Sequence, residues 1–304
     1  MITRRTVLML GAGASVPYGF PTGAGLRDCV CKSGSGANEV RKALIDCGYT
    51  GDAIDSFVTE LRESGRQSVD LFLEHRPDLV PIGKAAIAAA LIPFEESNSL
   101  FNDLSEKGKW YAHLFNQLDA PPDKWKENRL TVVTYNYDRS LEFFLLRALQ
   151  HSFNLNPRDA GELAKSVPVI HLHGLLAPLD EVQRGGRPYA PETLPGRVRL
   201  AAEAIQIISE AKPDDSRFVQ AREALSAAER VYILGFGYSH VNLERLGRSC
   251  FPSGHEHYAC TYGLRDGEQI EAESWFGGPV TLRGIDPRYD VLTFLRQYRA
   301  LRTP

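Results

Sequence analysis

Short apolar runs recur along the chain, and each is followed by a polar or glycine-rich turn. Runs of about four to eight apolar residues bounded by turns are typical of strands buried on both faces of a sheet. The pattern therefore predicts strands at Val7–Leu10, Leu130–Val133, Val167–Leu172 and Arg230–Leu234, with a weaker run at Tyr258–Tyr262.

The segments between these runs carry apolar residues at three- and four-residue spacing, which predicts helices. Helical patterning dominates from about residue 38 to residue 117, and Pro93 is expected to end the most apolar helix of this stretch. The clearest helical segments are Val69–His75, Ile82–Ile92, Leu141–Leu149, Leu200–Glu210, Asp215–Ala228 and Asn242–Cys250.

Strands that alternate with helices indicate an α/β fold with a Rossmann-like, mostly parallel sheet and helices on both faces. A chain of 304 residues suits one large domain or two small ones, and we find no internal repeat, low-complexity tract or linker. We therefore expect a single domain over residues 1–304, with a helical module of approximately 36–125 inserted between strands. The loops Arg184–Pro188 and Phe251–Gly254 are expected at the surface.

Composition narrows the class of protein. The chain is 43% hydrophobic and 24% charged, which fits a soluble globular protein. A net charge of -3 gives no global basic field for nucleic acid or an anionic membrane, although a local basic patch around Arg139 and Arg147 is left open. The apolar run after the first residues is too short for a signal peptide or a membrane span, so we expect a cytoplasmic protein.

Cysteine and histidine spacing argues against a disulfide framework and against a metal site. The 5 cysteines are scattered, odd in number and form no Cys-x-x-Cys pair, which indicates reduced thiols. His171 and His173 are two residues apart, but no cysteine or acidic partner stands at a convincing spacing for zinc. The cysteines are Cys29, Cys31, Cys47, Cys250 and Cys260.

The first turn with candidate chemistry is Gly11-Ala-Gly-Ala-Ser15. Glycines after a strand let backbone N–H groups approach a phosphate, and a helix start favours negative charge. Val16 stands where the dinucleotide fingerprint has a third glycine, and no acidic residue follows a second strand about 20 residues further on. A tight strand-to-helix turn is therefore an equal alternative.

The second turn, Thr134-Tyr-Asn-Tyr-Asp138, places an amide, a carboxylate and two phenols at the end of a strand. Strand ends in parallel sheets face the binding crevice, and the amide of Asn136 suits a sugar hydroxyl or a positioned water. Asp138 taken alone is more simply explained as the cap of the helix that begins near Ser140.

The third turn contains His171, His173 and Gly174. Strand alternation predicts that both histidines lie on the same face of the sheet. A histidine at a strand end is more often a hydrogen-bonded structural residue, but His173 stands directly before glycine, where a general base could meet a substrate.

The fourth turn, Gly235-Phe-Gly237, follows another buried strand and precedes a helix expected to be capped by Ser239 or Asn242. By itself it is an ordinary parallel-sheet turn. The shared position of all four turns at strand ends is what indicates a single ligand site.

In their order, these motifs resemble the sirtuin superfamily, and more closely the sirtuin-like NAD hydrolases of bacterial antiphage defence, the class of the Thoeris effector. The resemblance covers nearly the whole chain. Gly11–Ser15 is similar to the family's Gly-Ala-Gly-x-Ser, and Gly19–Gly23 is similar to the stretch after it. Thr134–Asp138 is similar to the family's Thr-Gln-Asn-x-Asp, with Tyr135 in place of glutamine. His173-Gly174 is similar to the His-Gly pair that contains the family's catalytic histidine. Val69–Pro77 and Trp110-Tyr111 look like the helical insert of the defence branch.

The chain also departs from the sirtuin pattern. The two Cys-x-x-Cys pairs of the zinc-binding members are missing, and the family's Gly-Thr-Ser loop is here Gly235-Phe-Gly237, which lacks its two hydroxyls. The resemblance therefore implies no zinc, and it favours NAD+ cleavage with water as acceptor over protein deacylation.

The resemblance implies an NAD+ glycohydrolase that depletes cellular NAD as an antiphage effector. In the mechanism we expect, Asn136 orients the ribose and a water, His173 accepts the proton, and Asp138 helps to place the nicotinamide end. Gly11, Gly13 and Ser15 would seat the pyrophosphate, with Gly235 and Asn242 on the adenosine side. The implied NAD-binding residues are Gly11, Ala12, Gly13, Ser15, Thr134, Asp138, Gly174, Gly235, Gly237 and Asn242.

Two other functions are left open at this point. One is a protein deacylase or ADP-ribosyltransferase that uses the same NAD site, and the other is a sensor that binds NAD or ADP-ribose without turnover. The presence of both Asn136 and His173 argues against a sensor, since binding alone needs no base. Because an unregulated NAD hydrolase would be toxic to its own cell, we expect a homo-oligomer or a regulatory partner protein, and no membrane or direct nucleic-acid partner.

Overall fold

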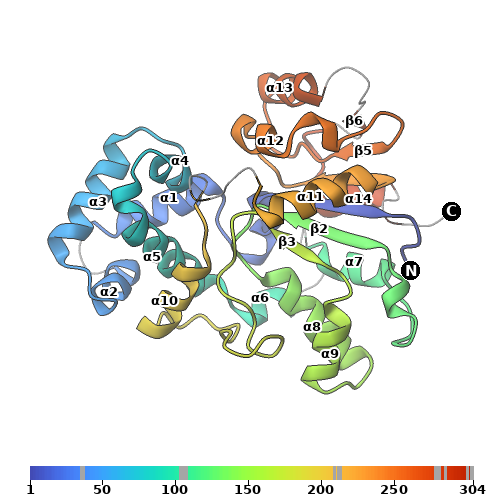
Figure 1. Cartoon of the computed structure of the whole chain (residues 1–304), viewed down its shortest axis with the longest axis horizontal. Coiled ribbons are helices and arrows are strands. Elements are labelled where there is room, and N and C mark those ends of the chain that lie inside the picture. Colours follow the sequence, from blue (N-terminus) through green and yellow to red (C-terminus); the bar gives the residue numbers. More distant parts are fainter. Residues whose placement is uncertain are drawn as a thin grey trace.

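Parallel strands form the central sheet of the computed structural model, which describes residues 1–34, 38–102, 109–207, 210, 214–276, 282–283, 286–298 and 301. The sheet is six-stranded, in the order β3-β2-β1-β4-β5-β6, and every pair of neighbours is parallel (Figure 1). The α/β Rossmann-like fold predicted from the sequence is therefore confirmed. The strands are β1 (Thr6–Leu10), β2 (Leu130–Thr134), β3 (Val169–His171), β4 (Arg230–Leu234), β5 (Glu256–Ala259) and β6 (Leu282–Arg283).

Each predicted apolar run forms a strand, with small shifts at the ends. β3 is shorter than expected because Pro168 has no N–H to donate and the residues after His171 turn away from the strand. The weaker run at Tyr258–Tyr262 is also displaced, since β5 begins at Glu256 and ends at Ala259. Strand positions are thus accurate to a few residues.

Alternate side chains of the strands enter two separate hydrophobic cores, one on each face of the sheet. Leu8 and Leu10 belong to one core, and Val7 and Met9 belong to the other, so β1 is buried on both sides. This explains its continuous apolar sequence, since a strand covered on both faces has no polar side.

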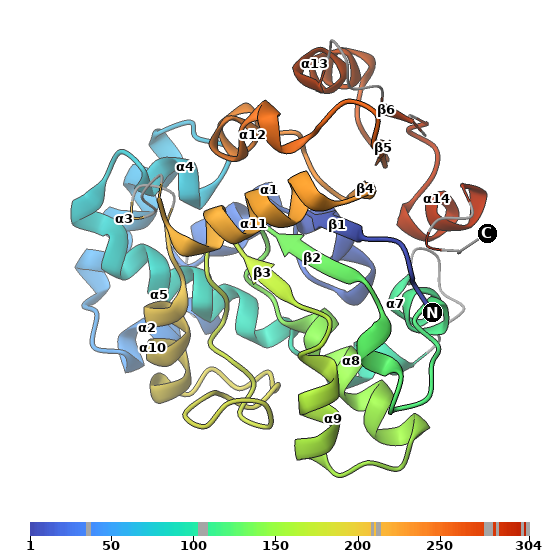
Figure 2. The ribbon, with the colours of Figure 1, turned by 45° about the vertical axis from the view of Figure 1, so that its right-hand side comes forward.

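Helices cover both faces, as Figure 2 shows for α8 and α11 on opposite sides of β2 and β3. Residues of α7, α8 and α14 pack in the core that contains Leu8, whereas residues of α11, α12 and α13 pack in the core that contains Met9. α9 packs against α8. Their bounds are α7 (Tyr111–Gln117), α8 (Ser140–Ser152), α9 (Pro157–Ala164), α11 (Ser216–Ala227), α12 (His240–Leu246), α13 (Asp266–Phe276) and α14 (Val291–Gln297).

A helical module lies beside the sheet, at the left of Figure 1. Most of it is inserted between β1 and β2, and α10 (Pro195–Ala204), from the connection between β3 and β4, packs against α5 and α2. The predicted span of 36–125 therefore omits α1 and α10; residues 36–37 and 103–108 lie outside the described residues. The inserted helices are α1 (Gly23–Lys32), α2 (Glu39–Asp46), α3 (Gly51–Glu63), α4 (Val69–Leu73), α5 (Val80–Leu91) and α6 (Ser97–Phe101).

The prediction of a helix at Leu200–Glu210 was displaced, since α10 occupies Pro195–Ala204 and residues 208–209 lie outside the described part. Pro195 begins α10, as proline favours the first turn of a helix, where its missing N–H has no partner to lose. At the end of α5, the helix stops at Leu91, two residues before Pro93, as expected.

The apolar segment around α5 is the centre of the helical module. Within the described residues, one helical run, the 18 residues of Pro77–Phe94, is long and apolar enough by composition to cross a membrane. However, 56% of this run is buried inside the protein, and α1, α2, α4 and α10 pack against α5. It is a core helix of the module.

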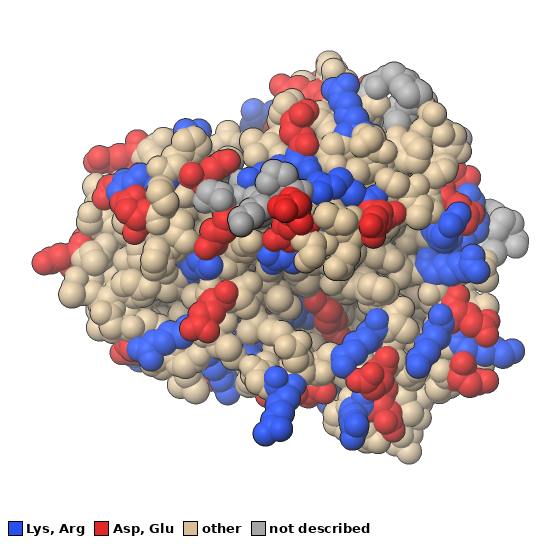
Figure 3. All heavy atoms as spheres, in the orientation of Figure 1, with Lys and Arg blue, Asp and Glu red and all other residues tan. Residues whose placement is uncertain are grey.

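The two loops expected at the surface do reach it, at Arg184 and Gly185 and at Ser253 and Gly254. Arg187 and Phe251 are exceptions within these loops, since they are only 1% and 3% exposed. Arg139 is completely buried, so it cannot contribute to a surface basic patch. On the face drawn in Figure 3, residues of both charge signs are interspersed.

Candidate functional site

Four strands end at the same level, and this brings the four turns together. Leu10 at the end of β1 pairs with Thr134 of β2 and with Leu234 of β4, and Thr134 pairs with His171 of β3. From β1 the strands β2 and β3 follow toward one edge of the sheet, whereas β4, β5 and β6 follow toward the other edge. The strand order therefore reverses between β1 and β4. In open α/β sheets this topological switch point is where ligands bind.

A cavity of about 950 Å³ lies at this edge of the sheet. Its volume is within the range of roughly 300–1,000 Å³ that small-molecule and cofactor sites occupy. Residues of the helical module form one wall, and residues of α12 and α13 form another. Of the residues singled out from the sequence, Gly11, Ala12, Ser15, Asn136, Asp138, His173, Gly237 and Asn242 line it.

Asn136 is held through nearly all of its hydrogen-bonding groups. Its backbone N–H donates to Thr134 Oγ1 at 3.0 Å, and its side-chain Nδ2 donates to the Gly11 carbonyl at 3.0 Å and to Ser15 Oγ at 3.1 Å. The Gly11 carbonyl can only accept, which fixes the orientation of the amide. Its Oδ1 is buried and has no hydrogen-bond partner among the described residues.

Asp138 combines the two functions considered for it. One carboxylate oxygen accepts from Ser15 Oγ at 2.8 Å, and the other accepts from Ser140 N–H at 3.2 Å and from the Ser140 hydroxyl. The carboxylate therefore caps the first turn of α8 while it lines the cavity. Burial raises the pKa of Asp138, and the hydrogen bonds from Ser140 and Ser15 act in the opposite direction.

His173 lies in an aromatic environment in the wall of the same cavity. Its ring is 5.5 Å from the Tyr135 ring and 6.2 Å from the Phe218 ring of α11, and the residue is 4% exposed. Neither ring nitrogen has a partner in hydrogen-bonding geometry within the described part of the chain. Burial lowers the pKa of His173 to about 4, although the nearby Asn242 side chain acts to raise it, so the imidazole is neutral near pH 7.

The expectation that His171 and His173 share a face is wrong. His171 contacts the backbone carbonyl of Asn136 and the carboxylate of Glu142 on α8, whereas His173 packs against Phe218 on α11. These helices cover opposite faces of the sheet. The strand ends at His171, and His173 lies in the turn that follows, so the alternation of strand side chains no longer applies to it.

The glycine turns pack tightly against one another and leave little backbone open to a ligand. Gly11 N–H donates to the Leu234 carbonyl at 3.0 Å, and Gly13 N–H donates to the Gly235 carbonyl at 2.8 Å. These two N–H groups are therefore engaged by the last residue of β4 and by the turn after it, and they are not free to donate to a phosphate in this structure. Gly13 and Gly235 do not line the cavity.

Thr134 and Gly174 support the site from outside the cavity. Thr134 Oγ1 accepts the Asn136 N–H, as described above. A Cβ on Gly174 would lie 2.0 Å from the Ala204 carbonyl, so this glycine allows the end of α10 to pass close to the turn. Their part in the site is to shape the turns that carry Asn136 and His173.

Several cavity residues were not identified from the sequence. Asp70 of α4 lines the cavity and accepts a hydrogen bond from Tyr137 OH, which joins the helical module to the second turn. Phe236 packs 5.1 Å from Tyr135, and Arg248 lies over the Trp275 ring at 5.5 Å. Phe236 lies in the fourth turn itself, whereas Asp70, Arg248 and Trp275 belong to helical segments. The sequence pattern that locates the ends of strands carries no signal for residues in distant helices.

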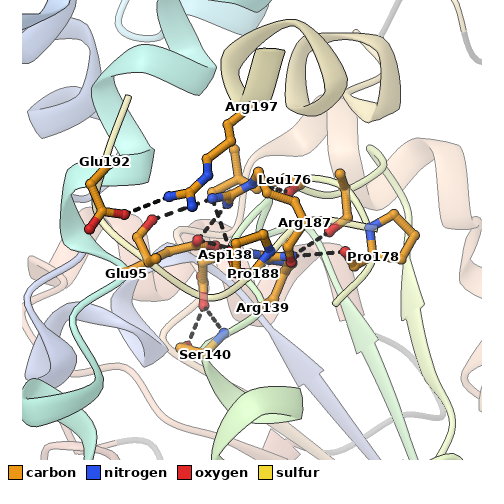
Figure 4. Close-up of polar contacts among 12 residues, drawn as sticks. Glu95, Asp138, Arg139, Ser140, Leu176, Pro178, Arg187, Pro188, Glu192 and Arg197 are labelled. Carbon is orange, nitrogen blue, oxygen red and sulfur yellow. Dashed lines mark hydrogen bonds and ion pairs between the residues drawn. The ribbon is translucent and has the colours of Figure 1, made fainter. Parts of the chain in front are cut away.

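A buried ion network supports the second turn from behind (Figure 4). Arg139 donates to both oxygens of Glu95 at 2.9 and 2.8 Å, Arg187 donates to the same carboxylate, and all three side chains are fully or almost fully buried. Arg139 also donates to the carbonyls of Ala177 and Pro178 at 3.0 Å. Burial lowers the pKa of Arg187 to about 10, although Glu95 opposes this effect.

Fold and site together define a Rossmann-like α/β protein with a ligand cavity at the switch point of its sheet. Comparison with protein-family models gives no match, and comparison with curated proteins gives none either. The geometry of the cavity is therefore the basis for assigning a function to this protein.

Proposed function

We propose that this protein is an NAD+ hydrolase that cleaves the bond between nicotinamide and ribose to give ADP-ribose and nicotinamide. One observation carries the proposal. Asn136 Oδ1 and both ring nitrogens of His173 are buried without a partner in hydrogen-bonding geometry in the described structure, the Asn242 side chain lies beside His173, and all three residues line one cavity. Buried polar groups are nearly always paired, so such a cluster indicates groups that await a ligand.

The position of the cavity supports a dinucleotide as that ligand. The strand order is that of the dinucleotide-binding Rossmann folds, in which the pyrophosphate crosses the sheet at the switch point. In the proposed complex the dinucleotide passes Ala12, Ser15 and Gly237, with the nicotinamide ribose beside Asn136 and His173. Asp138, in the same wall, lies beside the nicotinamide end.

The proposed reaction needs a held ribose and an acceptor for one proton. As the bond between C1′ and the nicotinamide nitrogen breaks, its electron pair leaves with nicotinamide, which becomes neutral and needs no acid. A water oriented by Asn136 bonds to C1′, and His173 accepts its proton and releases it to solvent. The products are ADP-ribose, nicotinamide and a proton.

The low pKa of His173 is compatible with this assignment. A group with a pKa of about 4 is unprotonated at neutral pH and so is ready to accept a proton. Although it is a weak base, water that bonds to an oxocarbenium-like carbon becomes strongly acidic, and a weak base is sufficient for it. The aromatic surroundings of His173 also limit access of other water.

The test is release of nicotinamide and ADP-ribose from NAD+ by the purified protein, alone and with its candidate partners. Loss of a general base commonly reduces a rate by roughly 10²–10⁴-fold, and we expect His173→Ala and Asn136→Ala to fall by this much. The matched controls are His151→Ala on α8 and Asn116→Ala on α7, both exposed, which should keep full activity. Normal turnover in folded forms of both site variants would contradict the proposal.

The same assay separates the alternatives. A deacylase or ADP-ribosyltransferase would consume NAD+ only with an acylated peptide or another acceptor, and mass spectrometry would detect the modified acceptor. A sensor would bind ADP-ribose in calorimetry but form no product. If hydrolysis is observed, we propose a role as an antiphage effector held inactive by a partner or by its assembly, to be tested by co-expression with neighbouring gene products.

A further inference from the structure

His171 lies directly behind Asn136 and outside the large cavity. Its Nδ1 is 2.8 Å from the Asn136 carbonyl oxygen, and its Nε2 is 2.6 Å from Glu142 Oε1 on α8. His171 and Glu142 line a second cavity, of about 430 Å³, at the β3 edge of the sheet, where residues of both α8 and α11 contribute to its lining. No part of the proposed hydrolysis uses either residue.

We infer that His171 and Glu142 form a positioning pair that fixes Asn136 for catalysis through its backbone carbonyl. The inference rests on the proposed function, in which Asn136 orients the ribose and water. It assigns a role in the reaction to a histidine that does not itself line the substrate cavity.

The hydrogen bonds of Asn136 explain why this contact matters. Thr134, Gly11 and Ser15 hold its N–H and its Nδ2, and His171 holds its carbonyl, so Oδ1 is the one group left for a ligand. Among these anchors only His171 has a side chain that can gain or lose a proton. A shift of about 1 Å in a positioned group can reduce a rate by roughly 10²-fold.

The geometry requires the imidazolium form of His171. Both of its ring nitrogens face acceptors, a carbonyl and a carboxylate, and only the doubly protonated ring can donate to both. Burial lowers the pKa of His171, but Glu142, the Asn136 carbonyl and Asp138 together outweigh burial and raise it above 6.5. Lys165 and Arg217 also line the second cavity, and their positive charges oppose this effect.

The sign of the pH dependence follows from this requirement. Below its raised pKa, His171 is charged and donates to both partners. As the pH rises through that pKa, the ring loses one N–H, and a lone pair then faces either Asn136 or Glu142. Turnover should therefore decrease on the alkaline side, and removal of the Glu142 charge should move that decrease to lower pH.

The experiment is the pH profile of kcat and KM for NAD+ hydrolysis by the full chain. We expect Glu142→Gln to move the alkaline decrease in kcat to lower pH, whereas Glu203→Gln, on the exposed side of α10, should leave the profile unchanged. His171→Asn keeps a donor near the Nδ1 position and should abolish the alkaline decrease. His171→Leu fills similar space without a donor, and kcat should fall roughly 10²-fold with KM unchanged.

A second measurement does not depend on activity. Nitrogen NMR of the histidine rings should show His171 doubly protonated at pH 7 in the wild type, and His171→Leu should bind ADP-ribose as the wild type does. A neutral His171 at pH 7, or a Glu142→Gln profile that coincides with the wild type, would overturn the inference alone. A wild type that never cleaves NAD+ would instead overturn the proposed function, and the inference with it.

Discussion

At the residue scale, the site depends on polar groups buried beside the sheet. Glu95 compensates two buried arginines, and these arginines donate to a series of backbone carbonyls. Arg139 directly follows the turn that contains Asn136 and Asp138, so the network anchors that turn to the helical module. Burial of these three charged side chains costs free energy of desolvation. This cost is offset because nearly every guanidinium N–H donates a hydrogen bond.

We predict that Glu95→Gln destabilises the protein by about 3–5 kcal/mol, because it leaves two buried guanidinium groups without a counter-charge. The free energy of unfolding in urea measures the effect. Glu96→Gln is the matched control, since this neighbouring glutamate is exposed and its charge is solvated. Equal stability of the two variants would show that the buried carboxylate has no special role.

The buried neutral His173 gives a second prediction, on the pH dependence of stability. Its pKa of about 4 in the folded protein lies below its usual 6.5, so the unfolded chain binds the extra proton first as pH falls. Stability that is complete above pH 6.5 should then be lost between pH 6.5 and 4, by up to about 3 kcal/mol. Urea unfolding at a series of pH values gives the free energy of unfolding of the wild type and of His173→Gln. The difference between these two free energies should change by this amount between pH 6.5 and 4, whereas the free energy of His151→Gln should follow that of the wild type at every pH.

At the element scale, the site is created by strands that end in register. The turns after β1 and β4 touch so closely that side chains are excluded from them. A Cβ on Gly235 would lie 2.0 Å from Ala14 N, and Gly235 has a φ of +58°, which other residues rarely adopt. Glycine is required here by the contact between two strand ends, and a phosphate is not needed to explain it.

We predict that Gly235→Ala destabilises the protein by more than Gly254→Ala. Gly254 has a φ of +90° with nothing within 4 Å of a Cβ, so its substitution costs only the backbone strain, about 1 kcal/mol. Gly235→Ala adds a clash with backbone and should cost about 3 kcal/mol or more. Thermal unfolding of both variants tests this; similar losses would mean that the strand ends can separate cheaply.

Prediction of elements from the sequence succeeded where burial dictates the pattern. β1 and β4 were located almost to the residue because both are buried at every position and contain mostly apolar residues. α9, α13 and α14 were missed, since they are short or lack a clear apolar stripe. The start of α10 was missed because its first turn, from Pro195, has few apolar residues and lies against the helical module.

At the scale of the whole molecule, the cavity lies between units that are distant in sequence. Asp70 and Leu71 of α4 line one wall, and Leu243 of α12 and Trp275 of α13 line another, with the strand ends as the floor. Figure 1 shows α4 in the helical module at the left and α12 above the sheet. A ligand in this cavity would contact both units at once.

We predict that ADP-ribose slows amide hydrogen exchange in α4 and α12, because a ligand that contacts both units suppresses their local opening. α9 contributes no residue to the cavity, lies at the opposite end of the view from α4 and α12 in Figure 2, and should exchange unchanged. Exchange measured by mass spectrometry with and without ADP-ribose tests this. Protection confined to α9 and α8, near the second cavity, would place the ligand elsewhere.

The sequence by itself determined the strands, the alternation with helices and the turns that carry Asn136 and His173, because these depend on local burial patterns and on chain order. Only the tertiary structure decided that Gly13 N–H is engaged by Gly235, that His171 and His173 face opposite sides, and that Arg139 and Arg187 are buried on Glu95. These facts depend on contacts between residues far apart in the chain. Local patterns carry no information about such contacts, and the chemistry of this site is set by them.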